Sequence, residues 1–62
     1  MTYDEAIELV QKWPEDRSVP RKLAEGIATA SDEEAPFMAQ LVEVLTTAAV
    51  SESDYALVDK YF

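Results

Sequence analysis

The sequence predicts an all-α fold: a compact bundle of three to four short helices around a central apolar helix, in one domain spanning residues 1–62. Two observations carry this prediction. Apolar residues recur at spacings of three and four through most of the chain, which is the period of an α-helix. Three segments also begin with Ser or Thr followed three residues later by an acid, the pattern that caps helix N-termini. We expect helices over about residues 2–13, 19–30, 32/36–49 and 52–61.

Composition limits the classes of function. The 62 residues include no cysteine and no histidine, so disulfides, thiolate metal sites and the commonest general base are excluded. The 13 acidic and 5 basic side chains give a net charge of −8, which disfavours direct binding to nucleic acid or to an anionic membrane surface. No segment has the pattern of a signal peptide or the ~20 apolar residues of a spanning helix, and we therefore expect a cytoplasmic protein.

The first predicted helix begins with a capping box, in which the Thr2 hydroxyl and the Glu5 carboxylate each accept a backbone N–H of the other residue. Its apolar face consists of Tyr3, Ala6, Ile7, Val10 and Trp13. Pro14 ends the helix, because the residue before a proline is disfavoured in helical conformation.

The second predicted helix has a weak apolar face. Ser18 is its candidate cap, and Pro20 lies in the first turn, where a missing N–H costs nothing. Its only side chains suited to burial are Leu23, Ala24, Ile27 and Ala28. Gly26 costs about 1 kcal/mol relative to alanine inside a helix, and it indicates either a close approach of two helices or an early helix end. We favour close packing against the central helix.

Residues 36–50 form the longest apolar-periodic run and predict the central helix. One row of this helix contains Phe37, Leu41, Leu45 and Ala48, and the adjacent apolar positions are Met38, Val42, Val44 and Ala49. Only a narrow polar seam remains, so we expect neighbours to cover this helix from several sides. Its β-branched residues suggest a strand as the alternative, but strict alternation fails and the run is too long.

The start of the central helix has two solutions. Ser31 and Glu34 form a capping-box pattern, but the Pro36 ring would clash with the carbonyl four residues earlier in an unbroken helix. Either Asp32 to Ala35 form a single turn before a fresh start at Pro36, or the helix continues with a kink at the proline.

The last predicted helix has Ser51 as its cap and Asp54 in the capping-box position, with Val50 and Tyr55 as a hydrophobic staple. Its aromatic face is expected to close over the central helix. This face consists of Tyr55, Val58, Tyr61 and Phe62.

No residue pattern indicates catalysis, a cofactor or a metal. Paired carboxylates such as Glu5 with Glu8 lie at predicted helix starts, where capping and solvation explain them. A calcium loop from Asp32 to Glu43 fails because Phe37 occupies the position that requires glycine. We therefore predict a chain that is not an enzyme and that binds no cofactor.

Clustered acids are the candidate contacts with a partner. They are Asp4, Glu5, Glu8, Asp32, Glu33, Glu34, Glu52 and Asp54. Carboxylates on rigid helices can imitate a row of phosphates and steer a domain onto a basic surface. We therefore predict a protein-binding inhibitor, antidote or regulator. Acidic four-helix bacteriocin immunity proteins and phage-encoded inhibitors are similar in size and charge, but this sequence shares no motif with them.

Two other contact surfaces follow from the sequence. Residues 12–22 hold four of the five basic side chains, and they form either a solvated connector or a patch for an acidic partner or a second copy. The alternative function is an accessory subunit or self-associating module of a larger assembly. Its apolar contacts would be Trp13, Tyr61 and Phe62.

Overall fold

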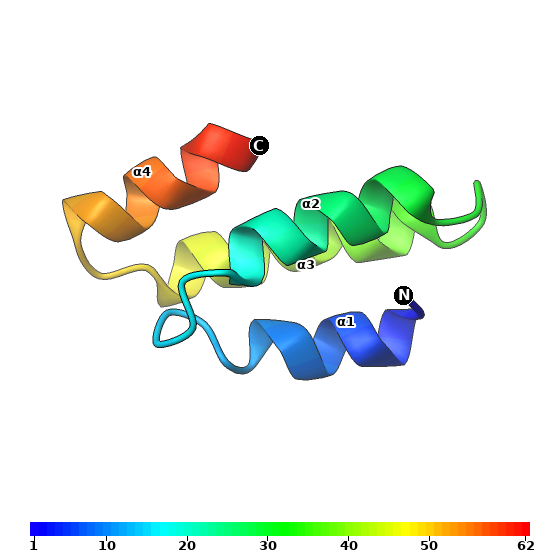
Figure 1. Ribbon diagram of the computed structural model, residues 1–62, viewed down its shortest axis with the longest axis horizontal. Helices are drawn as coiled ribbons and strands as arrows, with labels where there is room; N and C mark the ends of the chain where they lie inside the picture. The colour runs from blue at the N-terminus through cyan, green and yellow to red at the C-terminus, as the bar shows by residue number, and fades with distance from the viewer.

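The computed structural model describes all 62 residues and contains four α-helices and no strands, which confirms the all-α prediction (Figure 1). The helices are α1 (Tyr3–Val10), α2 (Val19–Thr29), α3 (Ala35–Ala48) and α4 (Glu52–Tyr61). Successive helices run in roughly opposite directions, in a globule that measures 32 × 19 × 16 Å along its principal axes. None of the four has the length and apolarity that crossing a membrane requires.

Helix α1 begins as predicted but ends early. The Thr2 hydroxyl accepts the Glu5 N–H at 3.3 Å, and the Glu5 carboxylate accepts the Thr2 N–H at 2.9 Å. The helix ends at Val10 and not at residue 13, because the chain tightens into turns over residues 11–15. These turns place the Trp13 ring in the core, where its Nε1–H donates to the Leu45 carbonyl at 2.9 Å. A buried indole needs such an acceptor.

The core lies between α2 and α3, each of which contacts the other three helices, whereas α1 and α4 do not touch. The largest fully buried side chains are Val19, Pro20, Leu23, Met38 and Leu45. The second helix is thus as central as the third. The sequence predicts a weak apolar face for this helix because it leaves out Val19 and Pro20. These are the first two residues of α2, and both are buried.

Helix α3 is not covered on all sides. Its buried residues are Met38, Leu41 and Leu45, whereas Phe37 and Val44 are 57% and 43% exposed. Three helices contact α3, as the prediction of neighbours on several sides requires, but the expected burial of Phe37 and Val44 is wrong. Three short neighbours are enough to cover one stripe of α3, and the opposite side faces solvent.

The start of α3 follows the first of the two predicted solutions, one residue earlier. Residues 32–34 form a turn, and the helix then begins at Ala35 without a kinked extension. The Ser31 hydroxyl accepts the Glu34 N–H at 3.2 Å, and the Ser31 carbonyl accepts the Ala35 N–H at 2.9 Å. Pro36 lies in the first turn, where the helix needs no N–H from it.

Helix α4 has the predicted capping box but not the predicted aromatic contact face. Ser51 Oγ accepts the Asp54 N–H at 3.2 Å, and the Asp54 carboxylate accepts the Ser51 N–H at 3.3 Å. The inward residues are Asp54 and Val58, while Val50 and Tyr55 are exposed and form no buried staple. Asp54 and Val58 lie one above the other on the same side of the helix because they are four positions apart. With Asp54 facing inward, Val58 therefore also faces the core.

Gly26 allows the close packing that the sequence predicts. A Cβ atom at this position would lie 3.3 Å from Met38 Cε on α3, and only 2.7 Å from Met1 Sδ. Met38 Cε is the end of a flexible side chain, and Met1 Sδ belongs to a flexible side chain that is 45% exposed, so both atoms can shift. We expect Gly26→Ala to gain up to about 1 kcal/mol of helix propensity and to raise Tm by a few degrees. We expect Gly26→Leu to overpack the site and lower Tm.

Thermal unfolding followed by circular dichroism checks both substitutions. A loss of stability in Gly26→Ala as large as that in Gly26→Leu would contradict the prediction, because it would mean that neither methionine can move.

Candidate protein-binding surface

The predicted acidic residues lie at two ends of the molecule and do not form one face. Helices α1 and α3 begin at the same end, and the Tyr3 and Phe37 rings meet there edge to face with centroids 6.4 Å apart. Helix α4 begins at the opposite end of the long axis (Figure 1). Glu52 and Asp54 are therefore separated from the other predicted acids. The acidic end, as we name it, consists of Asp4, Glu5, Asp32, Glu33 and Glu34.

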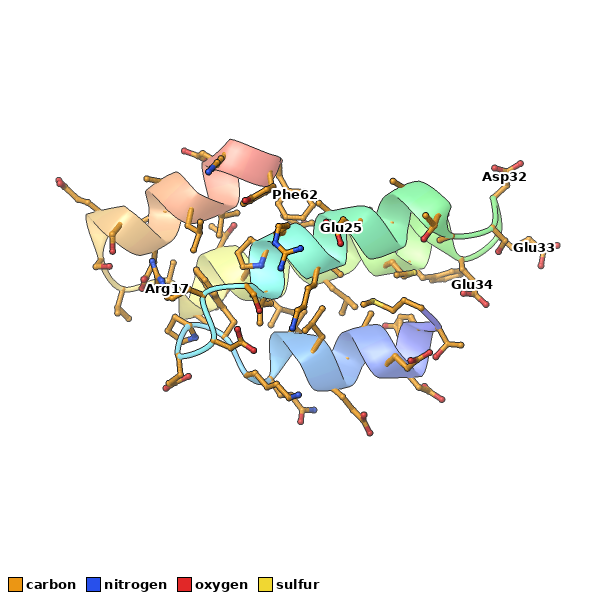
Figure 2. The ribbon with its side chains drawn as sticks, in the orientation of Figure 1. Arg17, Glu25, Asp32, Glu33, Glu34 and Phe62 are labelled. Atoms are coloured by element: carbon orange, nitrogen blue, oxygen red, sulfur yellow. The ribbon has the colours of Figure 1, made fainter.

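Most carboxylates at the acidic end form no hydrogen bond or ion pair within the protein. Asp32 and Glu33 are exposed and point away from the turn between α2 and α3 (Figure 2). Glu5 instead accepts the Thr2 N–H, and this backbone hydrogen bond is the main reason why its pKa is lowered. Glu8 lies on the exposed side of α1, beyond its first turn. The helix dipoles of α1 and α3 stabilise negative charge at this end.

Few of the acids are neutralised by a cation. Among the 13 acidic side chains, Asp54 pairs with Arg17 and Glu25 pairs with Arg21 at 3.2 Å. Eleven carboxylates therefore have no ion-pair partner. Helices α1 and α3 contain no lysine or arginine at all. Every charged side chain of these two helices is therefore negative.

Asp54 is a structural residue, although the sequence places it among the partner contacts. It is only 4% exposed, and its carboxylate accepts the Val50 N–H at 3.0 Å, the Ser51 N–H and the Arg17 guanidinium. The Val50 N–H, followed by the Arg17 guanidinium, lowers the pKa of Asp54 from 3.8 to about 2. A partner has no access to this buried carboxylate, so we remove Asp54 from the candidate surface.

Arg17 belongs to the predicted basic patch, but its charge is used within the fold (Figure 2). The guanidinium lies 4.9 Å from the centroid of the Trp13 ring, and it donates to the Pro14 carbonyl at 3.4 Å as well as to Asp54. It thereby joins the loop between α1 and α2 to the start of α4. The two partners of the ion pair are 37 positions apart, so no local pattern could have revealed it.

The apolar candidates also change. Trp13 is buried in the core and is not a surface contact, whereas Phe62 is exposed and Tyr61 is half-buried. The structure adds Phe37 and Val44 on the outer side of α3, which the sequence interpretation had buried. A signal for them was present, because both residues border the polar seam at helical spacings.

Other kinds of site have no counterpart on this surface. No pocket is found in the structure, and no three acidic side chains are placed to hold a metal ion. Comparisons with protein-family models, with curated proteins and with solved structures found no match to this chain.

Proposed function

We propose that this chain is a small acidic module that binds a basic surface of a target protein, as an inhibitor, antidote or regulator. The distribution of charge carries this proposal. Eleven carboxylates have no ion-pair partner, and α1 and α3 have no basic residue. A field of one sign attracts a complementary surface, raises the rate of encounter and suppresses wrong partners.

Rigid placement of the charges supports the same proposal. The acidic end is built on two helix starts and a short hydrogen-bonded turn, so the backbone positions of the acids are set before a partner arrives. Such preorganisation lowers the entropy that binding has to overcome. Carboxylates placed at set backbone positions are also how a protein imitates the phosphates of a nucleic acid.

Charge reversal at the acidic end tests the proposal. We expect the combined variant Asp32→Lys, Glu33→Lys, Glu34→Lys to lose capture of basic proteins from a lysate of the native host. Capture by the unchanged protein should weaken steeply between low and physiological salt, because exposed charges are screened over ~8–10 Å. Quantitative mass spectrometry of the captured proteins measures both effects.

A matched control separates the position of the charge from its total. The combined variant Glu15→Lys, Glu52→Lys, Asp59→Lys changes the net charge equally in the first loop and on α4. It should retain capture, and circular dichroism should show both variants folded. Equal loss in both variants would show that only net charge matters, and unchanged capture in the first would refute the proposal.

Self-association is a second candidate function, supported by the exposed aromatic side chains on and beside α4. Tyr55 and Phe62 are exposed although apolar, and Tyr61 is only half-buried. An assembly module would melt at a temperature that rises with protein concentration, and Phe62→Ala would weaken the association.

A further inference from the structure

We infer that the exposed side of α3 is a docking surface for a cationic amphipathic helix of the target protein; this inference rests on the proposed function. The α3 outer face, as we name it, consists of exposed residues at helical spacings along the whole of α3. They are Phe37, Gln40, Glu43, Val44 and Thr47.

Two apolar anchors define this face. Phe37 and Val44 are 57% and 43% exposed and lie seven residues apart, which is two turns or about 10.5 Å along the helix axis. Anchors at positions i and i+7 are how helices recognise one another lengthwise. The Tyr3 ring lies edge to face against Phe37, so the apolar surface continues from α3 onto α1.

The exposed anchors are not needed to complete the core. The stripe of Met38, Leu41 and Leu45 on the other side of α3 already packs against the neighbouring helices. Single exposed apolar residues are normal. Here the Phe37 ring contacts Tyr3 and stands two turns from Val44, and Gln40, Glu43 and Thr47 lie around these anchors. Apolar anchors within a polar border are typical of an interaction surface. The α3 outer face has this composition.

Charge identifies the occupant. All charged side chains of α1 and α3 are acidic. Glu43 lies on the α3 outer face, and Asp4 and Glu8 lie on the neighbouring helix α1. A second copy of the chain would place like charges opposite one another, and an anionic membrane would do the same. An all-α chain offers no strand edge for an extended peptide to join. A helix with an apolar stripe flanked by lysine or arginine satisfies both the anchors and the charge.

A designed peptide tests this docking surface. The probe is a leucine–lysine peptide of about 18 residues whose leucines form one helical stripe, compared with a peptide of the same composition in scrambled order. NMR titration of the isotope-labelled protein should place the largest shifts on the α3 outer face. The patterned peptide should bind at least about tenfold more tightly than the scrambled one, because one well-placed apolar anchor contributes about this factor in affinity.

Two double variants locate the site. Phe37→Gln with Val44→Gln should remove the tenfold advantage of the patterned peptide, while the scrambled peptide binds as before. The control, Val50→Gln with Tyr55→Gln, removes one valine and one aromatic side chain that are also exposed, on another part of the surface, and should keep the advantage. All four side chains are exposed, and glutamine is a good helix former at the three helical positions, so both variants should remain folded.

The outcomes distinguish this inference from the proposed function. If both peptides bind equally and Phe37→Gln with Val44→Gln has no effect, attraction by charge alone suffices and the docking surface is refuted. If neither peptide binds at low salt, the proposed function fails as well. If the free protein self-associates and Phe37→Gln with Val44→Gln abolishes this self-association, the occupant is a second copy and the inference is overturned. If anionic vesicles change the NMR chemical shifts of the α3 outer face, the occupant is a membrane and the inference is overturned.

Discussion

Leu45→Ala is expected to unfold the protein or to lower its melting temperature by about 10–30 °C. Leu45 is fully buried, and its carbonyl accepts the indole N–H of Trp13. Removing a buried leucine side chain costs ~2–5 kcal/mol, because the cavity is only partly refilled. A domain of this size has only ~3–9 kcal/mol of stability in total, and each kcal/mol corresponds to ~4–8 °C. Thermal and urea denaturation followed by circular dichroism measure the loss.

Phe37→Ala is the matched control for this prediction. Phe37 stands in the same helical row as Leu45, but it is 57% exposed in the structure. Its truncation removes the edge contact with Tyr3, worth ~0.5–1.5 kcal/mol, and creates no cavity. Equal losses in the two variants would show that Phe37 is buried, as the periodicity alone predicts, and would contradict the structure.

The comparison of Phe37 with Leu45 shows what periodicity can and cannot establish. Spacings of three and four identify α3 as a helix and place both residues in one row, because these properties depend on local geometry. Whether that row is covered depends on how many neighbours pack there, and the sequence does not contain this information in any local pattern. The helix starts at Thr2 and Ser51 were predictable for the same reason: a capping box lies within four residues.

The candidate site was less predictable than the fold. The acids at Asp32 and Glu33 are visible in the sequence, and their exposure follows from their place in a turn. The separation of Glu52 from them depends on the direction of α4, which is a tertiary property. The burial of Asp54 depends on Arg17, 37 positions away, and a capping acid of this kind has the same local pattern whether it is buried or exposed.

Asp54→Ala is expected to have the second large effect on stability. The carboxylate accepts the Val50 N–H, the Ser51 N–H and the Arg17 guanidinium, so its removal leaves three donors without their acceptor. The loss should exceed that of Ser51→Ala, which removes one cap at a cost of about 1 kcal/mol. Glu52→Ala, an exposed acid in the same helical turn, is the control and should change little. Urea denaturation of the three variants compares these losses directly.

The acid dependence of stability tests the charge of Asp54 separately from its shape. Its pKa falls from 3.8 to about 2 on folding, so the folded state holds the proton less tightly than the unfolded state. The ionised carboxylate therefore contributes its full stabilisation above about pH 4, and this contribution disappears as the pH falls towards 2. Asp54→Asn keeps the size of the side chain but cannot ionise, so its stability should vary less with pH in this window. Glu5 and Asp16, whose pKa values are also lowered, leave a residual slope in the variant. If the two proteins lost stability in parallel between pH 4 and pH 2, the Arg17–Asp54 pair could not be what secures α4 to the first loop.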